Sequence, residues 1–286
     1  VKMAIRYREL VKDLAEARVG LIEVIRKIEG GDKSAVDKLD SLIFDEKRMF
    51  SEDNKELFVL NTQAVKGIPR FNGNPFMIHP ASAAWLFAYL AANEKKLGRE
   101  TAEDRDKIIG FILTHDFLEE GLKYKEDRFA EAVTKWGSKH TNALVASVLM
   151  SSSHALSMNE RVEIVHQVKT YGSAALAYAT IIEKLDNMLD LEYVKTKRNP
   201  DIQASIKGWW ISQPLFVLKE LQDRIPEMYW PTLKICRGVI QDNSDVTYRS
   251  VYKKFKKYRQ DLHGDIGMIR KSAEEHLQRY NLLSQK

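Results

Sequence analysis

The chain has 286 residues, of which 44% are hydrophobic and 30% charged, and its formal net charge is +5. This length allows one large domain or two modest ones, each able to bury a sufficient core without disulfides. Cys236 is the single cysteine, which excludes an intramolecular disulfide and a multi-cysteine zinc cluster and suits a reducing compartment. No apolar run approaches the roughly 20 residues that span a bilayer, and residues 1–10 carry charges where a secretory signal would be apolar. We therefore expect a cytoplasmic protein that does not span a membrane.

The basic excess is concentrated near the end of the chain. Residues 250–286 contain nine lysines and arginines but only four acids, which accounts for the whole net charge. In "YKKFKKYRQ" (252–260) paired lysines alternate with aromatic residues. This pattern favours an amphipathic helix with a docked aromatic side and a solvated basic side, although contact with nucleic-acid phosphates stays open.

Helical periodicity dominates the chain. Apolar residues at three-to-four spacing predict a first helix from residue 7 that stops at Gly30 and Gly31, then shorter helical pieces up to Gly67. Prolines at 69, 75 and 80 predict a loop over 67–80 that leads into a helix. Further helices are expected over about 81–97, 102–119, 126–136, 139–150, 159–170 and 173–194. Because no alternating run predicts a strand, the expected fold class is all-α.

Four side chains in this pattern suggest a metal site. His79 ends the proline-rich loop, His115 and Asp116 lie near the end of an apolar helix, and Asp186 lies within another. Two imidazoles and two carboxylates suit one divalent ion, with Mn²⁺, Fe²⁺ and Zn²⁺ all chemically acceptable. Adjacent helical residues diverge by about 100°, so His115 and Asp116 would share an ion only if it lay across a helix end or between their two directions.

Glu119 and Glu120 lie one helical turn beyond His115 and Asp116, on the same faces. A carboxylate at this distance is placed to accept a proton from a metal-bound water or to orient that water for attack on phosphorus.

Each residue also has a purely structural interpretation. A histidine before a proline is commonly a turn residue, and a His-Asp pair before "EEG" is a plausible polar helix end. Asp186 lies among isoleucines and leucines, where a carboxylate is costly unless it is paired or coordinated. Pairing with Lys184 or Lys195 is the structural alternative for Asp186.

The order His, His-Asp and Asp resembles the HD superfamily of metal-dependent phosphohydrolases. Within it, "AVKGIPRFNGNPFMIHP" (64–80) is similar without a gap to the Ala-His-x-Gly-Gln-x-Arg-x-x-Gly-x-Pro-Tyr segment of RelA/SpoT-type alarmone hydrolases, including small alarmone hydrolases. "ILTHDFLEEG" (112–121) is similar to their Leu-Leu-His-Asp-x-x-Glu-Asp-Thr, and "IIEKLDNMLDL" (181–191) to their Lys-Leu-Ala-Asp helix. The resemblance covers roughly residues 55–200.

The resemblance implies an HD-domain helical bundle, here with additional N-terminal and C-terminal helices. It implies that His79, His115, Asp116 and Asp186 hold one Mn²⁺, with Fe, Zn or Mg as alternatives. It also implies that Glu119 and Glu120 position or activate water and that Arg70 lines the nucleotide pocket. The expected organisation is an N-terminal helical extension (1–54), a phosphohydrolase core (55–215) and a basic helical C-terminal segment (216–286).

Several positions depart from the alarmone-hydrolase pattern. Leu149 and Met150 occur in "ASVLMSSS" where those enzymes usually carry Val-Thr-Lys, and Asp190 replaces an asparagine that helps to hold the nucleotide. Lys195 and Arg198 follow as a basic cluster, either near a polyphosphate or as a basic helix end that complements the helix dipole.

The expected function is therefore a nucleotide phosphohydrolase that uses metal-activated water, with guanosine 3′,5′-bispyrophosphate as the leading substrate. A (deoxy)nucleotide phosphohydrolase or phosphodiesterase, and a non-catalytic protein that binds nucleotide or nucleic acid, are the alternatives.

Overall fold

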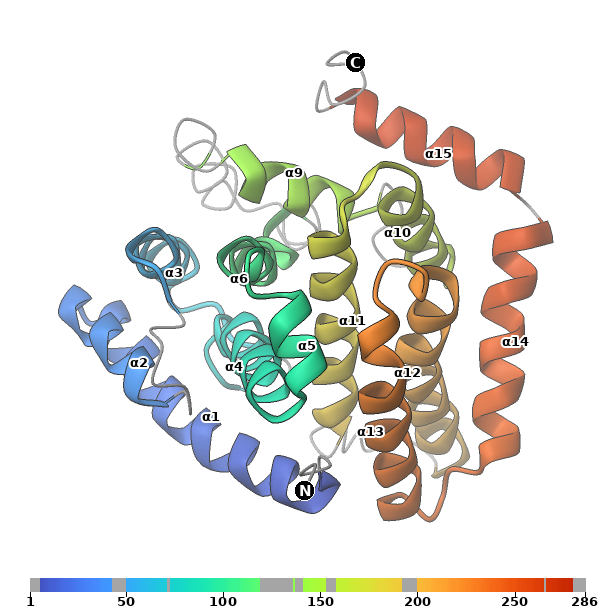
Figure 1. Cartoon of the computed structure of the whole chain (residues 1–286), viewed down its shortest axis with the longest axis horizontal. Helices are drawn as coiled ribbons and strands as arrows, with labels where there is room; N and C mark the ends of the chain where they lie inside the picture. Colours follow the sequence, from blue (N-terminus) through green and yellow to red (C-terminus); the bar gives the residue numbers. More distant parts are fainter. Residues whose placement is uncertain are drawn as a thin grey trace.

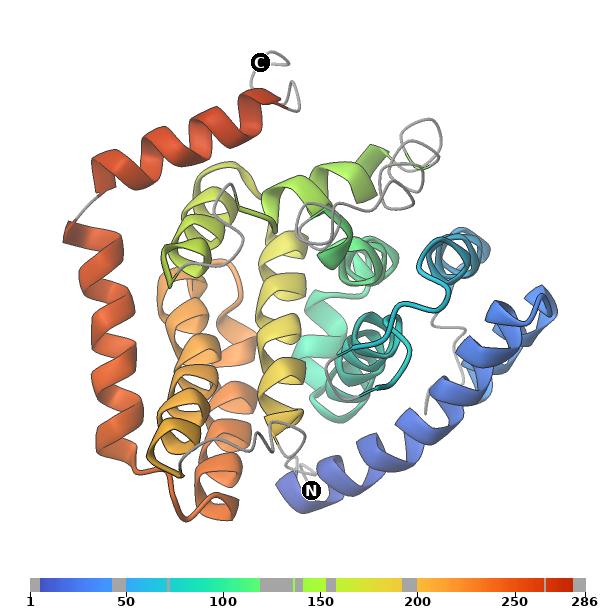
Figure 2. The ribbon, with the colours of Figure 1, turned by 180° about the vertical axis from the view of Figure 1, so that it is seen from behind.

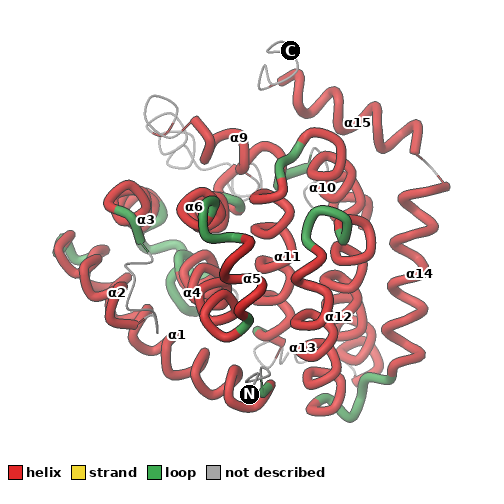
Figure 3. Tube along the Cα trace, viewed as in Figure 1, coloured by secondary structure: helices red, strands yellow, loops and turns green. Residues whose placement is uncertain are grey.

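A computed structural model describes residues 6–42, 50–70, 73–118, 136, 141–152, 158–191, 200–264 and 266–279. Within these ranges every regular element is a helix, and the only strand-like pairing is an isolated bridge between Pro69 and Pro75 (Figure 3). The all-α prediction is confirmed. No helix in the described ranges has the length and apolar character needed to cross a membrane.

The first half of the chain contains the long helix α1 and several shorter helices, which lie on one side of the molecule (Figure 1). They are α1 (Tyr7–Glu29), η1 (Lys33–Lys38), α2 (Leu39–Leu42), α3 (Glu52–Ala64), α4 (Ile78–Asn93), α5 (Lys95–Glu100) and α6 (Arg105–Thr114). The second half contains α9 (Thr141–Leu149), α10 (Met158–Tyr171), α11 (Ala174–Leu189), α12 (Pro200–Leu221), η3 (Pro226–Met228), α13 (Tyr229–Asp242), α14 (Tyr248–Gly264) and α15 (Ile266–Arg279).

Helix α11 is the central element. It packs against α4, α6 and α12, which surround it in both views (Figures 1 and 2). Ser173 caps its N-terminus, because the Ser173 hydroxyl accepts a 3.2 Å hydrogen bond from the backbone N–H of Leu176. Most of its side chains are buried, including the acids Glu183 and Asp186. Buried carboxylates on a central helix require partners from the surrounding helices.

The N-terminal helix packs on the same core as the rest of the chain. Helix α1 covers the three-to-four pattern predicted for it, buries residues such as Leu14 and Leu21, and packs against α4. It ends before Gly31, whose φ of 105° is readily adopted only by glycine. One hydrophobic cluster extends from Leu10 in α1 to Leu277 in α15. Side chains of α1 can therefore reach the centre of the protein.

Some predicted boundaries shift in the structure. The loop expected over 67–80 ends earlier, so that His79 lies in the first turn of α4. The helix expected over about 102–119 corresponds to α6, which stops at Thr114 with His115 as its C-cap. The helix expected over 126–136 lies outside the described residues except for Trp136, which is buried.

The basic C-terminal segment forms an amphipathic helix as expected. In α14, Val251, Tyr258 and Leu262 are buried against the protein, whereas Lys253 and Lys256 are exposed. The expected docking of the aromatic side holds in part, because Tyr258 is buried and Phe255 half-buried, whereas Tyr252 is exposed to solvent.

Candidate metal centre

Three helices bring together residues that are far apart in the sequence. His79 comes from the first turn of α4, His115 and Asp116 follow the end of α6, and Asp186 lies in α11. Both histidines and Asp186 are buried, whereas Asp116 is partly exposed. The four residues predicted to hold a metal therefore lie at one site among packed helices.

Hydrogen bonds fix the orientation of both imidazole rings. His79 Nδ1 lies 2.6 Å from Asp186 Oδ2, and His115 Nδ1 lies 2.6 Å from the carbonyl oxygen of Ile112. Because carbonyl and ionised carboxylate oxygens only accept, each Nδ1 carries the hydrogen and donates. In the neutral rings, each Nε2 is then left with a lone pair, which is the form that binds metals.

The two Nε2 atoms face each other across the site at 3.2 Å. Two lone pairs at this distance repel, so the arrangement requires a positive charge between or beside them, either a proton or a cation. Asp116 supplies a third donor, because its Oδ1 lies 2.9 Å from His115 Nε2 and its Oδ2 lies 3.6 Å from His79 Nε2. Ligand atoms of His79, His115 and Asp116 all lie within 4.8 Å of one another. Two imidazole nitrogens and a carboxylate suit a divalent transition ion.

The adjacent residues His115 and Asp116 lie just past Thr114, the last residue of α6, although His115 keeps helical backbone angles. His115 Nε2 and Asp116 Oδ1 are only 2.9 Å apart, so both side chains turn towards the same site.

The ionisation states match this geometry. Burial alone would lower the pKa of His115, but the neighbouring Asp116 and Glu183 carboxylates outweigh it and raise that pKa above its ordinary value. Burial opposes ionisation of Asp116, yet His115, His79 and Arg70 hold the pKa of this carboxyl well below its usual range. The neighbouring carboxylates thus favour a proton on His115 in the absence of an ion, and a divalent ion would compete with that proton.

Asp186 is engaged by three protein groups. Its Oδ1 accepts hydrogen bonds from Ser82 Oγ at 2.7 Å and Arg18 Nη2 at 2.9 Å, and its Oδ2 accepts from His79. Burial would raise the pKa of Asp186, but Arg18 and His79 lower it to about 2. In this arrangement Asp186 holds the His79 ring in place.

The structural alternative for Asp186 was a pair with Lys184 or Lys195. Lys184 pairs instead with Glu183, at 2.6 Å between Nζ and Oε2, and Lys195 lies outside the described residues. The cation beside Asp186 is Arg18 from α1, which sequence reasoning missed.

The ion pairs of Arg18 distinguish the two groups of side chains that could bind a cation. Its Nη1 lies 2.6 Å from Asp190 Oδ1, so one guanidinium bridges Asp186 and Asp190. These two acids and His79 form a second group whose ligand atoms lie within 4.8 Å. Because Arg18 already neutralises this group, the set of His79, His115 and Asp116 is the better cation site. Burial and the Asp186 charge raise the pKa of Asp190, against the opposing effect of Arg18.

Glu183 is a second residue that sequence reasoning missed. It is buried, and its Oε1 lies 3.9 Å from His79 Nε2, the atom that faces the site. It also accepts a hydrogen bond from Asn187 Nδ2. The available signal was its position one turn before Asp186 in an apolar helix, which places both acids on the same side of that helix.

Arg70 lies at the edge of the site, with its Nη1 4.0 Å from Asp116 Oδ2. A tight loop presents it, because the Arg70 N–H donates to the Asn74 carbonyl at 2.8 Å and the Gly73 N–H donates to the Arg70 carbonyl at 2.9 Å. Gly73 has a φ of 80°, which disfavours other residues there. The predicted residues Glu119, Glu120, Lys195 and Arg198 lie outside the described residues.

Comparison of the chain with models of protein families, with curated proteins and with solved structures found no match.

Proposed function

We propose that this chain is a metal-dependent phosphohydrolase that acts on a nucleotide. The observation that carries the proposal is the pair of buried Nε2 atoms, 3.2 Å apart, with both Nδ1 atoms already committed as donors. Asp116 completes a compact set of three ligands around them. A divalent cation would satisfy both facing nitrogens and the Asp116 carboxylate at once, which supports the proposal.

His79, His115 and Asp116 would hold the ion, and Asp186 would keep His79 in the correct tautomer. The resemblance favours Mn²⁺, and mixed nitrogen and oxygen donors also suit Fe²⁺ or Zn²⁺ better than Mg²⁺, which prefers oxygen alone. When bound, the ion would supply Lewis acidity and lower the pKa of a coordinated water. Direct ligation by Asp186, which the resemblance predicts, would require it to exchange one of its present partners for the ion.

The chain's own residues supply the remaining chemistry. Arg70 carries a planar guanidinium next to Asp116, which suits bidentate contact with a phosphate group. Glu119 and Glu120 are predicted to accept a proton from the attacking water. With these roles, the negatively charged phosphate of the substrate would lie beside Arg70.

Guanosine 3′,5′-bispyrophosphate is the leading substrate, and another nucleotide phosphoester is the alternative. Leu149 and Met150 are buried apolar residues at positions where alarmone hydrolases carry Thr and Lys. Asp190 is paired with Arg18, so a contact between Asp190 and substrate would require that pair to open. These differences lie outside the set of His79, His115 and Asp116, so they favour an altered substrate over lost chemistry.

The test is release of phosphate or pyrophosphate by the purified Mn²⁺-treated protein. The panel contains the alarmone, common (d)NTPs and (d)NMPs, and cyclic dinucleotides, and the matched variant is Asp116→Ala. We expect release from at least one compound and its loss in the variant, with unchanged helicity by circular dichroism. No release from any compound by the parent protein, despite bound metal, would favour a non-catalytic nucleotide-binding protein.

A further inference from the structure

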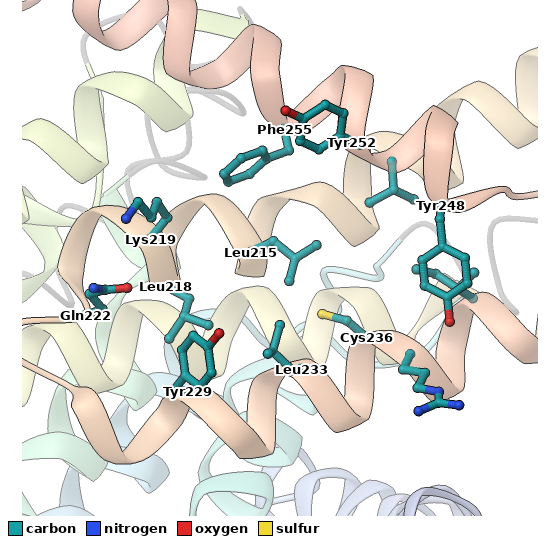
Figure 4. Close-up of a pocket in the computed structure, with 13 residues that line it drawn as sticks. Leu215, Leu218, Lys219, Gln222, Tyr229, Leu233, Cys236, Tyr248, Tyr252 and Phe255 are labelled. Atoms are coloured by element: carbon teal, nitrogen blue, oxygen red, sulfur yellow. The ribbon is translucent and has the colours of Figure 1, made fainter.

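A groove separate from the metal centre lies between α13 and α14. Both helices pack on α12 but scarcely contact each other, which leaves a gap with α12 as its floor. The gap encloses a cavity of about 440 Å³ (Figure 4). This volume lies within the roughly 300–1,000 Å³ that is usual for small-molecule sites.

The walls of the groove are apolar side chains at helical spacing. Figure 4 shows Leu215 from α12, Leu233 and Cys236 from α13, and Phe255 from α14 pointing into the same space. Exposed tyrosines border it, with Tyr229 near one end and Tyr248 near the other. Apolar walls of this kind favour a ligand with an apolar body, because water gains few hydrogen bonds there.

The charges that line the groove all have the same sign. Lys219 and Arg237 are its only charged lining residues among the described part of the chain, and both are exposed. Neither forms an ion pair with another described residue. An anionic group is therefore the complementary partner, and the guanidinium of Arg237 suits bidentate contact with a carboxylate.

We propose that this groove binds an amphiphilic carboxylate, with the apolar chain along α12 and the carboxylate on Arg237. An acidic amphipathic helix from a partner protein is the main competing occupant. The small cavity and its wholly cationic lining charge favour the amphiphile, since an apolar chain fills the cavity and needs only one ionic contact. This inference is independent of the metal centre and of the proposed hydrolysis.

The experiment is a fluorescence titration of the full chain with 11-(dansylamino)undecanoic acid, followed by displacement with octanoate, decanoate and dodecanoate below their micelle concentrations. We expect saturable binding of one probe per chain. Affinity should rise about fourfold for each added methylene until the groove is full. Dodecanol, which lacks the charge, should displace the probe at least about tenfold less well than dodecanoate.

Variants distinguish this groove from non-specific binding. Arg237→Ala should weaken dodecanoate binding about tenfold or more, and Leu233→Trp should abolish it by filling the groove. Trp230→Ala is the matched control, because Trp230 is 66% exposed, adjoins Tyr229 and does not line the cavity. Circular dichroism checks that each variant folds, and Arg237 is exposed, so its replacement tests the proposal even if Leu233→Trp does not fold.

Three results would overturn the proposal. They are the absence of saturable probe binding, probe binding that Arg237→Ala leaves unchanged, and equal displacement by dodecanol and dodecanoate. Displacement of the probe by a designed acidic amphipathic helical peptide, but not by dodecanoate, would also overturn it and would assign the groove to a partner helix.

Discussion

Replacing Arg18 with methionine tests whether α1 is an integral part of the candidate site. Arg18 is 13% exposed in its side chain and bridges the carboxylates of Asp186 and Asp190, whose side chains are 0% and 7% exposed. Methionine has a similar length and helix propensity but no charge. Arg18→Met therefore leaves two buried acids without their shared cation while preserving α1.

The expected loss of stability is large. Removing one partner of a buried ion pair typically costs about 3–5 kcal/mol, because the remaining charge is uncompensated. The unfolding entropy of 286 residues is about 0.6 kcal/mol/K at roughly 2.1 cal/mol/K per residue, so this loss corresponds to a Tm lower by about 5–8 °C. Because Arg18 and His79 lower the pKa of Asp186 to about 2, its ionised pairing stabilises the fold fully above its ordinary pKa of about 3.9. That contribution fades as the pH falls towards 2, so the difference between variant and parent should shrink in acid.

The assay is thermal unfolding by circular dichroism at pH 7 and at about pH 2.5, which lies between the ordinary and the lowered pKa of Asp186, with urea unfolding as a second measure. Arg26→Met is the matched control, since Arg26 lies on the same helix and is exposed. Arg18→Met combined with Asp190→Asn removes one of the two acids and should recover part of the loss. A loss below about 1 kcal/mol for Arg18→Met, equal to that of Arg26→Met, would refute the inferred bridge.

Three further outcomes follow from other contacts. Glu183→Gln should weaken Mn²⁺ binding about tenfold with little change in helicity, because it removes a charge 3.9 Å from His79 Nε2. Calorimetric titration measures the Mn²⁺ affinity, and an unchanged affinity would exclude Glu183 from the site. Burial raises the pKa of the Cys236 thiol, so iodoacetamide at pH 8 should modify it much more slowly in the native protein than in the unfolded chain, as mass spectrometry would show; equal rates would contradict the raised pKa. Glu220 is partly desolvated, but Lys169 and Arg259 lower its pKa, so Glu220→Gln should cost about 1 kcal/mol in urea unfolding at pH 7. That cost should shrink as the pH falls from the ordinary glutamate pKa of about 4.3 through the lower pKa of Glu220 in the folded protein, and a cost independent of pH would argue against an ionic origin.

Local patterns in the sequence predicted most of the helices and part of the site. The three-to-four spacing of apolar residues located α1 and α11, since a buried helical face needs that period. The histidines and Asp116 were identified because their residue types and order are those of a known ligand set. His79, His115, Asp116 and Asp186 do lie together, and Arg70 lies beside them.

Contacts between distant segments could not be predicted in the same way. Arg18 resembles any other charged residue of an amphipathic helix, and its contact with Asp186 spans 168 residues of sequence. The groove between α13 and α14 depends on how both helices pack on α12, which periodicity on each helix does not specify. The exposed Trp230 illustrates the same limit, since its aromatic surroundings in the sequence predict packing rather than exposure.

Metal binding itself tests the central claim most directly. The measurement is calorimetric titration of the metal-free protein with Mn²⁺, with elemental analysis of the dialysed complex. We predict one ion per chain, at least tenfold weaker binding in His79→Ala and in His115→Ala, and unchanged binding in His263→Ala, which removes a half-exposed histidine at the end of α14. Failure of the parent protein to bind Mn²⁺, Fe²⁺ or Zn²⁺, or equal binding by the parent protein and both site variants, would contradict the account.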